Sequence, residues 1–303
     1  MNELKKLTGC GFLLFWYAKF MYTDEGLFMN FHLKKIFKYL LFGFSLGSVC
    51  FAYGSSLDIK IIDNNATTLK SIANKAAWGA YGVDGKAFEN YHKVAIWAHS
   101  ADRVGFSLFD GSGNQASEIT DGAQVQIPTA FGQLNRYDSP TIITAVASFQ
   151  KWLKKYHAIA SLWSGSTMAA VLITPGAATL VHVGDSRIVV ERDGQEIFST
   201  LDHVSMTSSG FNLERVFGHF GHFDKNKDAG VPSVYRLTVQ KGDHFIIASR
   251  ALWTIFSTEE AIDFVYYERE NNINLSDIAK HLVSRAQDLG CNETLSAIII
   301  EIQ

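Results

Sequence analysis

Two short stretches of the sequence place an aspartate where it could bind a ligand. In the first, Phe109-Asp110-Gly111, an apolar segment (103–109) ends at a carboxylate and runs into the small residues 111–114. A strand that ends in such a loop presents its carboxylate at the edge of a sheet. We therefore expect Asp110 to face a ligand, while an aspartate that only accepts backbone N–H bonds in a loop has the same pattern.

The second stretch is Gly184-Asp185-Ser186-Arg187, which interrupts an apolar run. Apolar residues occupy 180–183 and 188–190, and the run breaks again at Asp193-Gly194. Because Gly, Asp and Ser tolerate tight reversals, the pattern predicts a central hairpin of strand, turn and strand. Asp185 is then either a ligand or a residue that stabilises the turn.

The segments around these aspartates predict an α+β layered fold of one domain, with no internal repeat or linker from residue 55 onward. We expect strands at 57–61 (an edge strand), 166–174, 179–183, 187–192 and 295–302, and strand pairs at 92–99 with 103–109 and at 234–239 with 244–249. Apolar spacings of three and four predict a helix over 140–157. Two further helices are expected to begin with the caps Thr258 and Ser276.

Composition allows a full core and argues against one class of partner. The chain has 303 residues, 47% of them hydrophobic, and a formal net charge of -3. The body of the chain contains no basic run, so we do not expect it to bind nucleic acid.

The N-terminal part has the pattern of a secretory signal peptide that begins at Met29. Three lysines precede an apolar stretch (39–49), and Ala52 follows at a plausible cleavage site. We expect residues 1–52 to form a leader, with Met29 as the true start, and residues 53–303 to form the mature domain. The protein is then exported or secreted, for example to a periplasm, and contacts a membrane only if the leader stays uncleaved.

Several motifs resemble the metal-dependent serine/threonine phosphatases of type 2C, the PPM family. Ser164-Gly165-Ser166-Thr167, the 184–187 turn and Asp202-His203 match the middle of these enzymes in order and spacing. Phe109-Asp110-Gly111 resembles their Asp-Gly metal motif, residues 248–254 (ASRALWT) their Ala-Ser-Asp-Gly-Leu-Trp-Asp motif, and residues 291–294 (CNET) their closing Asp-Asn-x-Thr. The resemblance covers nearly all of the mature domain.

The resemblance implies a four-layer sandwich of two antiparallel sheets flanked by helices. It also implies Mg²⁺ or Mn²⁺ ions that activate a water for attack on phosphoserine or phosphothreonine, since hard cations prefer oxygen ligands and paired metals neutralise the phosphate. The metal ligands that it assigns are the carboxylates of Glu89, Asp110 and Asp185 and the carbonyl of Gly111.

The same motifs have lost several residues that metal chemistry needs. Asn90, Arg250, Thr254 and Cys291 each stand where the family has an aspartate, Ser112 replaces a histidine, and Gly85 lies where a phosphate-binding arginine is expected. Arg250 puts a cation where a dication would bind, and the thiol of Cys291 is a poor ligand for Mg²⁺ or Mn²⁺. Lys86 could partly replace the lost arginine as a phosphate contact.

These losses favour a pseudophosphatase with a weakened metal site that binds a partner, for example a phosphoprotein, without turnover. A divergent Mg²⁺- or Mn²⁺-dependent phosphatase is one alternative, with Glu89, Asp110 and Asp185 holding a single metal. A structural exported domain that binds no phosphate is another. Metal binding separates the enzyme from the other two, and binding of a phosphopeptide without metal separates the pseudophosphatase from the structural domain.

Overall fold

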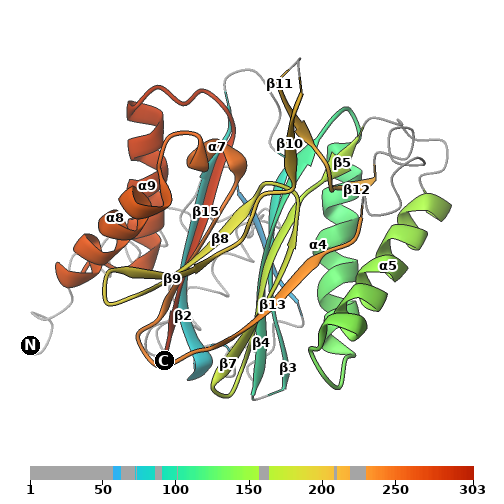
Figure 1. Ribbon diagram of the computed structural model, residues 1–303, viewed down its shortest axis with the longest axis horizontal. Helices are drawn as coiled ribbons and strands as arrows, with labels where there is room; N and C mark the ends of the chain where they lie inside the picture. Colours follow the sequence, from blue (N-terminus) through green and yellow to red (C-terminus); the bar gives the residue numbers. More distant parts are fainter. Residues whose placement is uncertain are drawn as a thin grey trace, which may run out of the picture. The chain divides into compact units, whose positions relative to one another are not determined.

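The computed structural model describes residues 57–62, 72, 74–85, 91–100, 102–156, 164–207, 210–218 and 230–303. Over these residues two β-sheets pack face to face (Figure 1). Helices α4 (Ala116–Gly132) and α5 (Ser139–Tyr156) cover one sheet, and α8 (Thr258–Glu270) and α9 (Leu275–Asp288) cover the other. This arrangement confirms the predicted α+β sandwich.

The first sheet has the strand order β1-β3-β4-β6-β7-β13. Its strands are β1 (Asp58–Ile61), β3 (His92–Ser100), β4 (Arg103–Ser112), β6 (Met168–Thr174), β7 (Ala177–Val183) and β13 (Ser233–Thr238), with the short β5 (Gly165–Ser166) and β12 (Phe217–Gly218) beside β4. The predicted edge strand and the predicted hairpin of β3 and β4 are both confirmed. The expectation of a purely antiparallel sheet is wrong at one place, because β1 runs parallel to β3. A parallel pair needs a long connection, and the chain between these strands makes β2 of the other sheet.

The second sheet has the order β2-β15-β14-β8-β9, and its neighbouring strands are antiparallel. Its strands are β2 (Ala76–Val83), β15 (Leu295–Ile302), β14 (His244–Ala248), β8 (Arg187–Arg192) and β9 (Gln195–Ser199). A separate hairpin of β10 (Val204–Thr207) and β11 (Gly210–Leu213) stands above the sheets in Figure 1.

The central hairpin predicted around Gly184-Asp185-Ser186 is wrong in its pairing. The strands on either side exist, but β7 belongs to the first sheet and β8 to the second, so the turn carries the chain from one sheet to the other. Gly184 has φ of +103°, and a Cβ there would lie 2.6 Å from the Thr167 side chain, so the crossover needs glycine. The pairing predicted for 234–239 with 244–249 fails likewise, because β13 and β14 lie in different sheets.

The C-terminal helices begin one or two residues from the predicted caps. Ser257, not Thr258, caps α8 and forms a capping box with Glu260. Asn274, not Ser276, caps α9, and its side chain accepts a hydrogen bond from the backbone N–H of Asp277. The helix predicted at 140–157 is confirmed as α5, whereas α4 was not predicted.

The core has three apolar layers, one between the sheets and one under each helix pair. Successive residues of β3 point to opposite faces, so that Val94 and Ile96 pack between the sheets while Ala95 and Trp97 pack against α4 and α5. The predicted leader, 1–52, lies outside the described residues. Within the described part, no helix is both long and apolar enough to cross a membrane.

Candidate functional site

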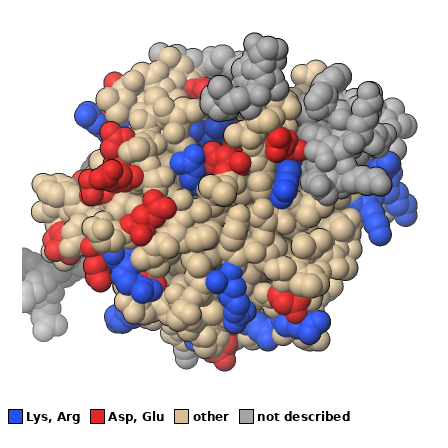
Figure 2. Space-filling model, viewed as in Figure 1, with Lys and Arg blue, Asp and Glu red and all other residues tan. Residues whose placement is uncertain are grey.

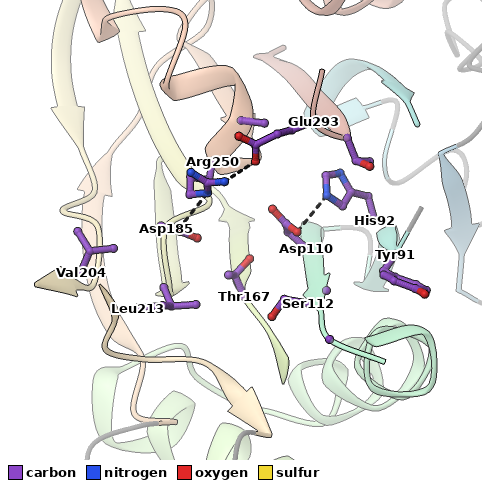
Figure 3. Close-up of a pocket in the computed structure, with 14 residues that line it drawn as sticks. Tyr91, His92, Asp110, Ser112, Thr167, Asp185, Val204, Leu213, Arg250 and Glu293 are labelled. Atoms are coloured by element: carbon purple, nitrogen blue, oxygen red, sulfur yellow. Dashed lines mark hydrogen bonds and ion pairs between the residues drawn. The ribbon is translucent and has the colours of Figure 1, made fainter. Parts of the chain in front are cut away.

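A pocket of about 440 Å³ opens where strands of both sheets end. Asp110 comes from the end of β4, Asp185 from the crossover between β7 and β8, Arg250 from the first residue of the short helix α7 (Arg250–Trp253), and Glu293 from the segment before β15. Figure 3 shows these four side chains converging. The structure thus brings together Asp110, Asp185 and Arg250, which the sequence analysis singled out separately.

The carboxylate of Asp110 is paired with a histidine from the neighbouring strand. His92 Nε2 lies 3.0 Å from Asp110 Oδ1, and the other ring nitrogen, Nδ1, lies 2.9 Å from the Ser296 hydroxyl (Figure 3). Both His92 and Ser296 are buried. Asp110 is therefore held at the pocket by a buried hydrogen-bond chain and is not a loop carboxylate that bonds only to backbone.

Asp185 is a largely buried carboxylate, only 8% exposed. Burial is the main cause that raises its pKa to about 7, the negative charges of Asp110 and Asp202 act in the same direction, and the Arg250 guanidinium opposes the shift. Its nearest basic group in the described residues is Arg250, whose Nε lies 3.8 Å from Asp185 Oδ2. The pairing is therefore too long to be a hydrogen bond.

Arg250 lies between two carboxylates. Its guanidinium forms an ion pair with Glu293 and faces Asp185 (Figure 3). A fixed positive charge thus stands at the position where the resemblance places an aspartate ligand. The arginine neutralises acidic groups of the pocket in the way that a bound cation would.

Of the other predicted site residues, some line the pocket and some lie outside the described part of the chain. Gly111 and Ser112 line the pocket, as expected from the Asp-Gly motif. Glu89, Lys86 and Asn90 lie outside the described residues.

Two substituted positions lie beside the pocket without lining it. The hydroxyl of Thr254 donates to the Ala251 carbonyl at 2.8 Å, and Cys291 Sγ lies 3.9 Å from the same oxygen. The region of the predicted Trp motif and that of the closing motif are therefore in contact.

Arg187 and Asp202, which belong to the matched motifs, stabilise the crossover between β7 and β8. Arg187 donates two hydrogen bonds to the Asp202 carboxylate, at 3.1 and 2.8 Å, and its guanidinium stacks 5.2 Å from the Trp253 ring. His203 accepts a hydrogen bond from the Gly184 N–H through Nδ1. These contacts fix the turn that carries Asp185.

The sequence analysis missed His92, Thr167 and Glu293 as pocket residues. Thr167 lies 2.6 Å, hydroxyl to hydroxyl, from Ser186 and thereby braces the turn beside Asp185. Glu293 lies within the CNET motif, where a carboxylate two residues after the lost aspartate position was a usable signal. His92 carried no such signal, because it opens an apolar strand like many buried histidines.

The described residues do not fit the Mg²⁺ or Mn²⁺ centre that the resemblance implies. Asp110 is paired with His92, and Arg250 faces both Asp185 and Glu293. Among the residues that the structure describes, no three histidine, cysteine or carboxylate side chains form a group that could hold a metal ion. Hard dications need several oxygen ligands and are repelled by a guanidinium.

Comparisons with known proteins agree with the motifs. The family model for protein phosphatase 2C matches residues 208–295. The chain is 22% identical to mouse protein phosphatase 1B over 246 residues, covering 72% of this chain and 60% of the mouse protein, and 27% identical to the human protein, covering 72% and 49%. The chain thus spans less than two thirds of the length of these relatives.

Solved structures show the same fold. A serine/threonine phosphatase of S. agalactiae superposes with a TM-score of 0.63 at 15% identity, covering 75% of this chain and 100% of that one. A phosphatase of Toxoplasma gondii gives a TM-score of 0.66 at 14% identity, covering 76% and 93%. By its motifs and its relatives this chain is similar to protein phosphatase 2C proteins, and its fold is the one seen in these solved phosphatases.

Proposed function

We propose that this chain is a pseudophosphatase, which keeps the 2C fold, does not hydrolyse phosphate esters and acts by binding another protein. The observation that carries the proposal is the position of Arg250 between Asp185 and Glu293. A side chain of the protein supplies there the positive charge that a metal supplies in an active member of the family.

Two further features of the pocket support the loss of turnover. Ser112 lines it where the resemblance places a histidine that serves as general acid, and a serine hydroxyl does not protonate a leaving group at neutral pH. Gly85 stands where the phosphate-binding arginine is expected. A Cβ at Gly85 would lie 2.6 Å from the Thr294 backbone nitrogen, so this backbone leaves no room for a side chain there.

We also propose that the protein is exported by its predicted leader. The support is the sequence pattern of three lysines, an apolar stretch and Ala52 after Met29. N-terminal sequencing of the product from the natural host tests this, because a mature chain that starts near residue 53 is expected and one that retains the leader contradicts export with cleavage.

The proposal on function is tested with the full chain and two substrates, an aryl phosphate and a phosphothreonine peptide. Each is incubated with Mn²⁺, with Mg²⁺ and with a chelator, and the same is done with Asp110→Ala. We expect phosphate release at the background rate in every condition. Metal-dependent release that Asp110→Ala abolishes would overturn the proposal and identify a divergent phosphatase.

A further inference from the structure

The charges that line the pocket do not suit a phosphate group. Its lining contains three carboxylates, Asp110, Asp185 and Glu293, and the basic groups His92 and Arg250. Each basic group already faces a carboxylate, at 3.0 Å for His92 and through the ion pair to Glu293 for Arg250. With the carboxylates ionised, acidic groups outnumber basic ones among the described lining residues even when His92 is charged. A cation is therefore favoured over an anion.

The face of the molecule seen in Figure 2 carries charged side chains of both signs. Lysine and arginine side chains on this face are interspersed with aspartate and glutamate and do not form a continuous basic area. Phosphate recognition normally uses gathered arginine or lysine side chains with free hydrogen-bond donors. On this face, the charges provide no such gathering.

Asp185 accepts a hydrogen bond from its own backbone N–H but none from a side chain in the described part of the protein. Asp185 is only 8% exposed and lines the pocket. Arg250 Nε, at 3.8 Å, contributes charge without a hydrogen bond. Buried carboxylates are normally hydrogen-bonded, so this one can accept donors from a ligand.

The size and walls of the pocket indicate an organic cation. Its volume of about 440 Å³ is more than ten times the roughly 30 Å³ that one water molecule occupies in the liquid. Val204 and Leu213 of the β10–β11 hairpin line it beside the carboxylates (Figure 3). Ala251 of α7 lines it as well. Such walls can contact an alkyl chain while the carboxylates receive the N–H groups at its end.

We propose that this pocket binds a primary ammonium group on an alkyl chain, as carried by a lysine side chain of a partner protein or by a free alkylamine. The inference rests on the proposed pseudophosphatase function and names the chemistry of its ligand. The ammonium donates to Asp185 and to the free face of Asp110, and the alkyl chain packs between Val204, Leu213 and Ala251. Arg250 stays paired with Glu293 and keeps dications out.

Binding is measured on the full chain by calorimetry and ligand-observed NMR, at pH 8, low ionic strength and with a chelator present. The probes are n-butylammonium, the blocked peptide acetyl-Gly-Lys-Gly-amide, its Nε-acetyl-lysine form, and inorganic phosphate. We expect millimolar or tighter binding of the two ammonium probes and no binding of the acetylated peptide or of phosphate. A peptide that binds more tightly than butylammonium identifies lysine of a protein as the source, and the reverse order identifies a free alkylamine.

Two variants locate the binding. Asp185→Asn is expected to weaken the ammonium probes at least about tenfold, because a charge-assisted hydrogen bond is lost. Asp263→Asn removes an exposed carboxylate of α8 and is the matched control, with unchanged binding expected. The acetylated peptide tests the same charge in the unaltered protein and does not depend on the folding of a variant.

The ligand inference is overturned if neither ammonium probe binds, if the acetylated peptide binds as well as the free one, if phosphate binds more tightly, or if both variants weaken binding equally. Because these measurements are made with a chelator, they do not depend on the turnover assays. Metal-dependent turnover would overturn the pseudophosphatase proposal, and loss of ammonium binding alone would overturn only the ligand.

Discussion

The ring Nδ1 of His92 lies 2.9 Å from the hydroxyl of Ser296 and so joins the two sheets, since His92 opens β3 and Ser296 belongs to β15. The chain of contacts continues in both directions. Ser296 N–H donates to the Ser249 hydroxyl at 3.2 Å, next to Arg250, and His92 Nε2 faces Asp110. A buried polar path thus connects the two charged halves of the pocket through the interior.

Ser296→Ala is expected to lower the free energy of unfolding by about 1–3 kcal/mol. The substitution removes the Ser296 hydroxyl from a buried ring nitrogen of His92, and the loss of one partner of a buried hydrogen bond costs that much. Denaturant unfolding measures the change. Ser148→Ala is the control, because that serine is exposed on α5 and its hydroxyl donates to the Thr144 carbonyl of the same helix, so its loss should cost under about 0.5 kcal/mol. Equal costs for the two variants would contradict an inter-sheet role for Ser296.

Gly85→Ala is expected to destabilise the fold by about 1–3 kcal/mol, because the added Cβ meets backbone atoms of 292–294 at 2.6 to 2.9 Å. Gly132→Ala at the end of α4 is the control: the nearest atom to its Cβ is 3.8 Å away, and alanine favours helix, so no loss is expected there. Gly85→Arg should therefore fail to restore phosphate binding. A thermal melt compares the parent with the Gly85→Ala and Gly132→Ala variants. A Gly85→Ala protein as stable as the parent would show that residues 292–294 move easily to make room for the Cβ.

Stability is expected to depend on pH through His182 and His203, whose rings lie 4.6 Å apart. Burial is the main cause that lowers the pKa of His182 to about 4 and that of His203 to about 3, and nearby arginine charge adds to both shifts. The unfolded chain takes up a proton on each near its usual pKa of 6.5, while the folded state does not, so their contribution to stability falls as pH drops below 6.5.

Asp185 has the opposite effect on stability. Its pKa is raised to about 7 in the folded protein, so the folded state binds the proton at a higher pH than the unfolded state does, and its contribution to stability increases as pH falls from 7. The difference in stability between the parent and a His182→Leu variant isolates the contribution of His182. Relative to the parent, His182→Leu should gain about 2–3 kcal/mol between pH 7 and pH 4.5, measured by urea unfolding. A difference that stays constant with pH would show that His182 titrates normally in the folded protein.

The elements were more predictable than their pairing. β15 was predicted at its observed bounds, and α5 and the β3–β4 hairpin were predicted within a few residues. The two false pairings both join strands of different sheets. β7 is buried at every position, so it lacks the alternation that would show which face meets which layer, and a crossover between sheets has the same turn residues as a hairpin. α4 was missed although Ile119, Ala123, Ile127 and Phe131 follow one another at a spacing of four.

Pocket residues that belong to a local sequence motif could be singled out from the sequence. Pocket residues whose role depends on a long-range contact could not. Asp110 lies near the end of β4 before a glycine and Asp185 lies in a glycine-containing crossover, and these local patterns singled out both residues. His92 gains its role from Asp110 on the adjacent strand and from Ser296, 204 residues further along the chain, and no local pattern reports such a contact. The pairing of Arg250 with Glu293 likewise depends on the approach of α7 to the segment before β15.

Arg250→Asp combined with Cys291→Asp is expected to raise the affinity for Mn²⁺, because the change removes the guanidinium from Asp185 and Glu293 and adds two hard ligands in contacting segments. Calorimetry at pH 8 measures it. Cys291→Asp alone is the control and should gain little, since Arg250 still opposes a dication. Affinity should rise before any rate does, because Ser112 and Gly85 still replace the general acid and the phosphate-binding arginine. If the double variant binds Mn²⁺ no better than the single one, Arg250 is not what excludes the metal from this pocket.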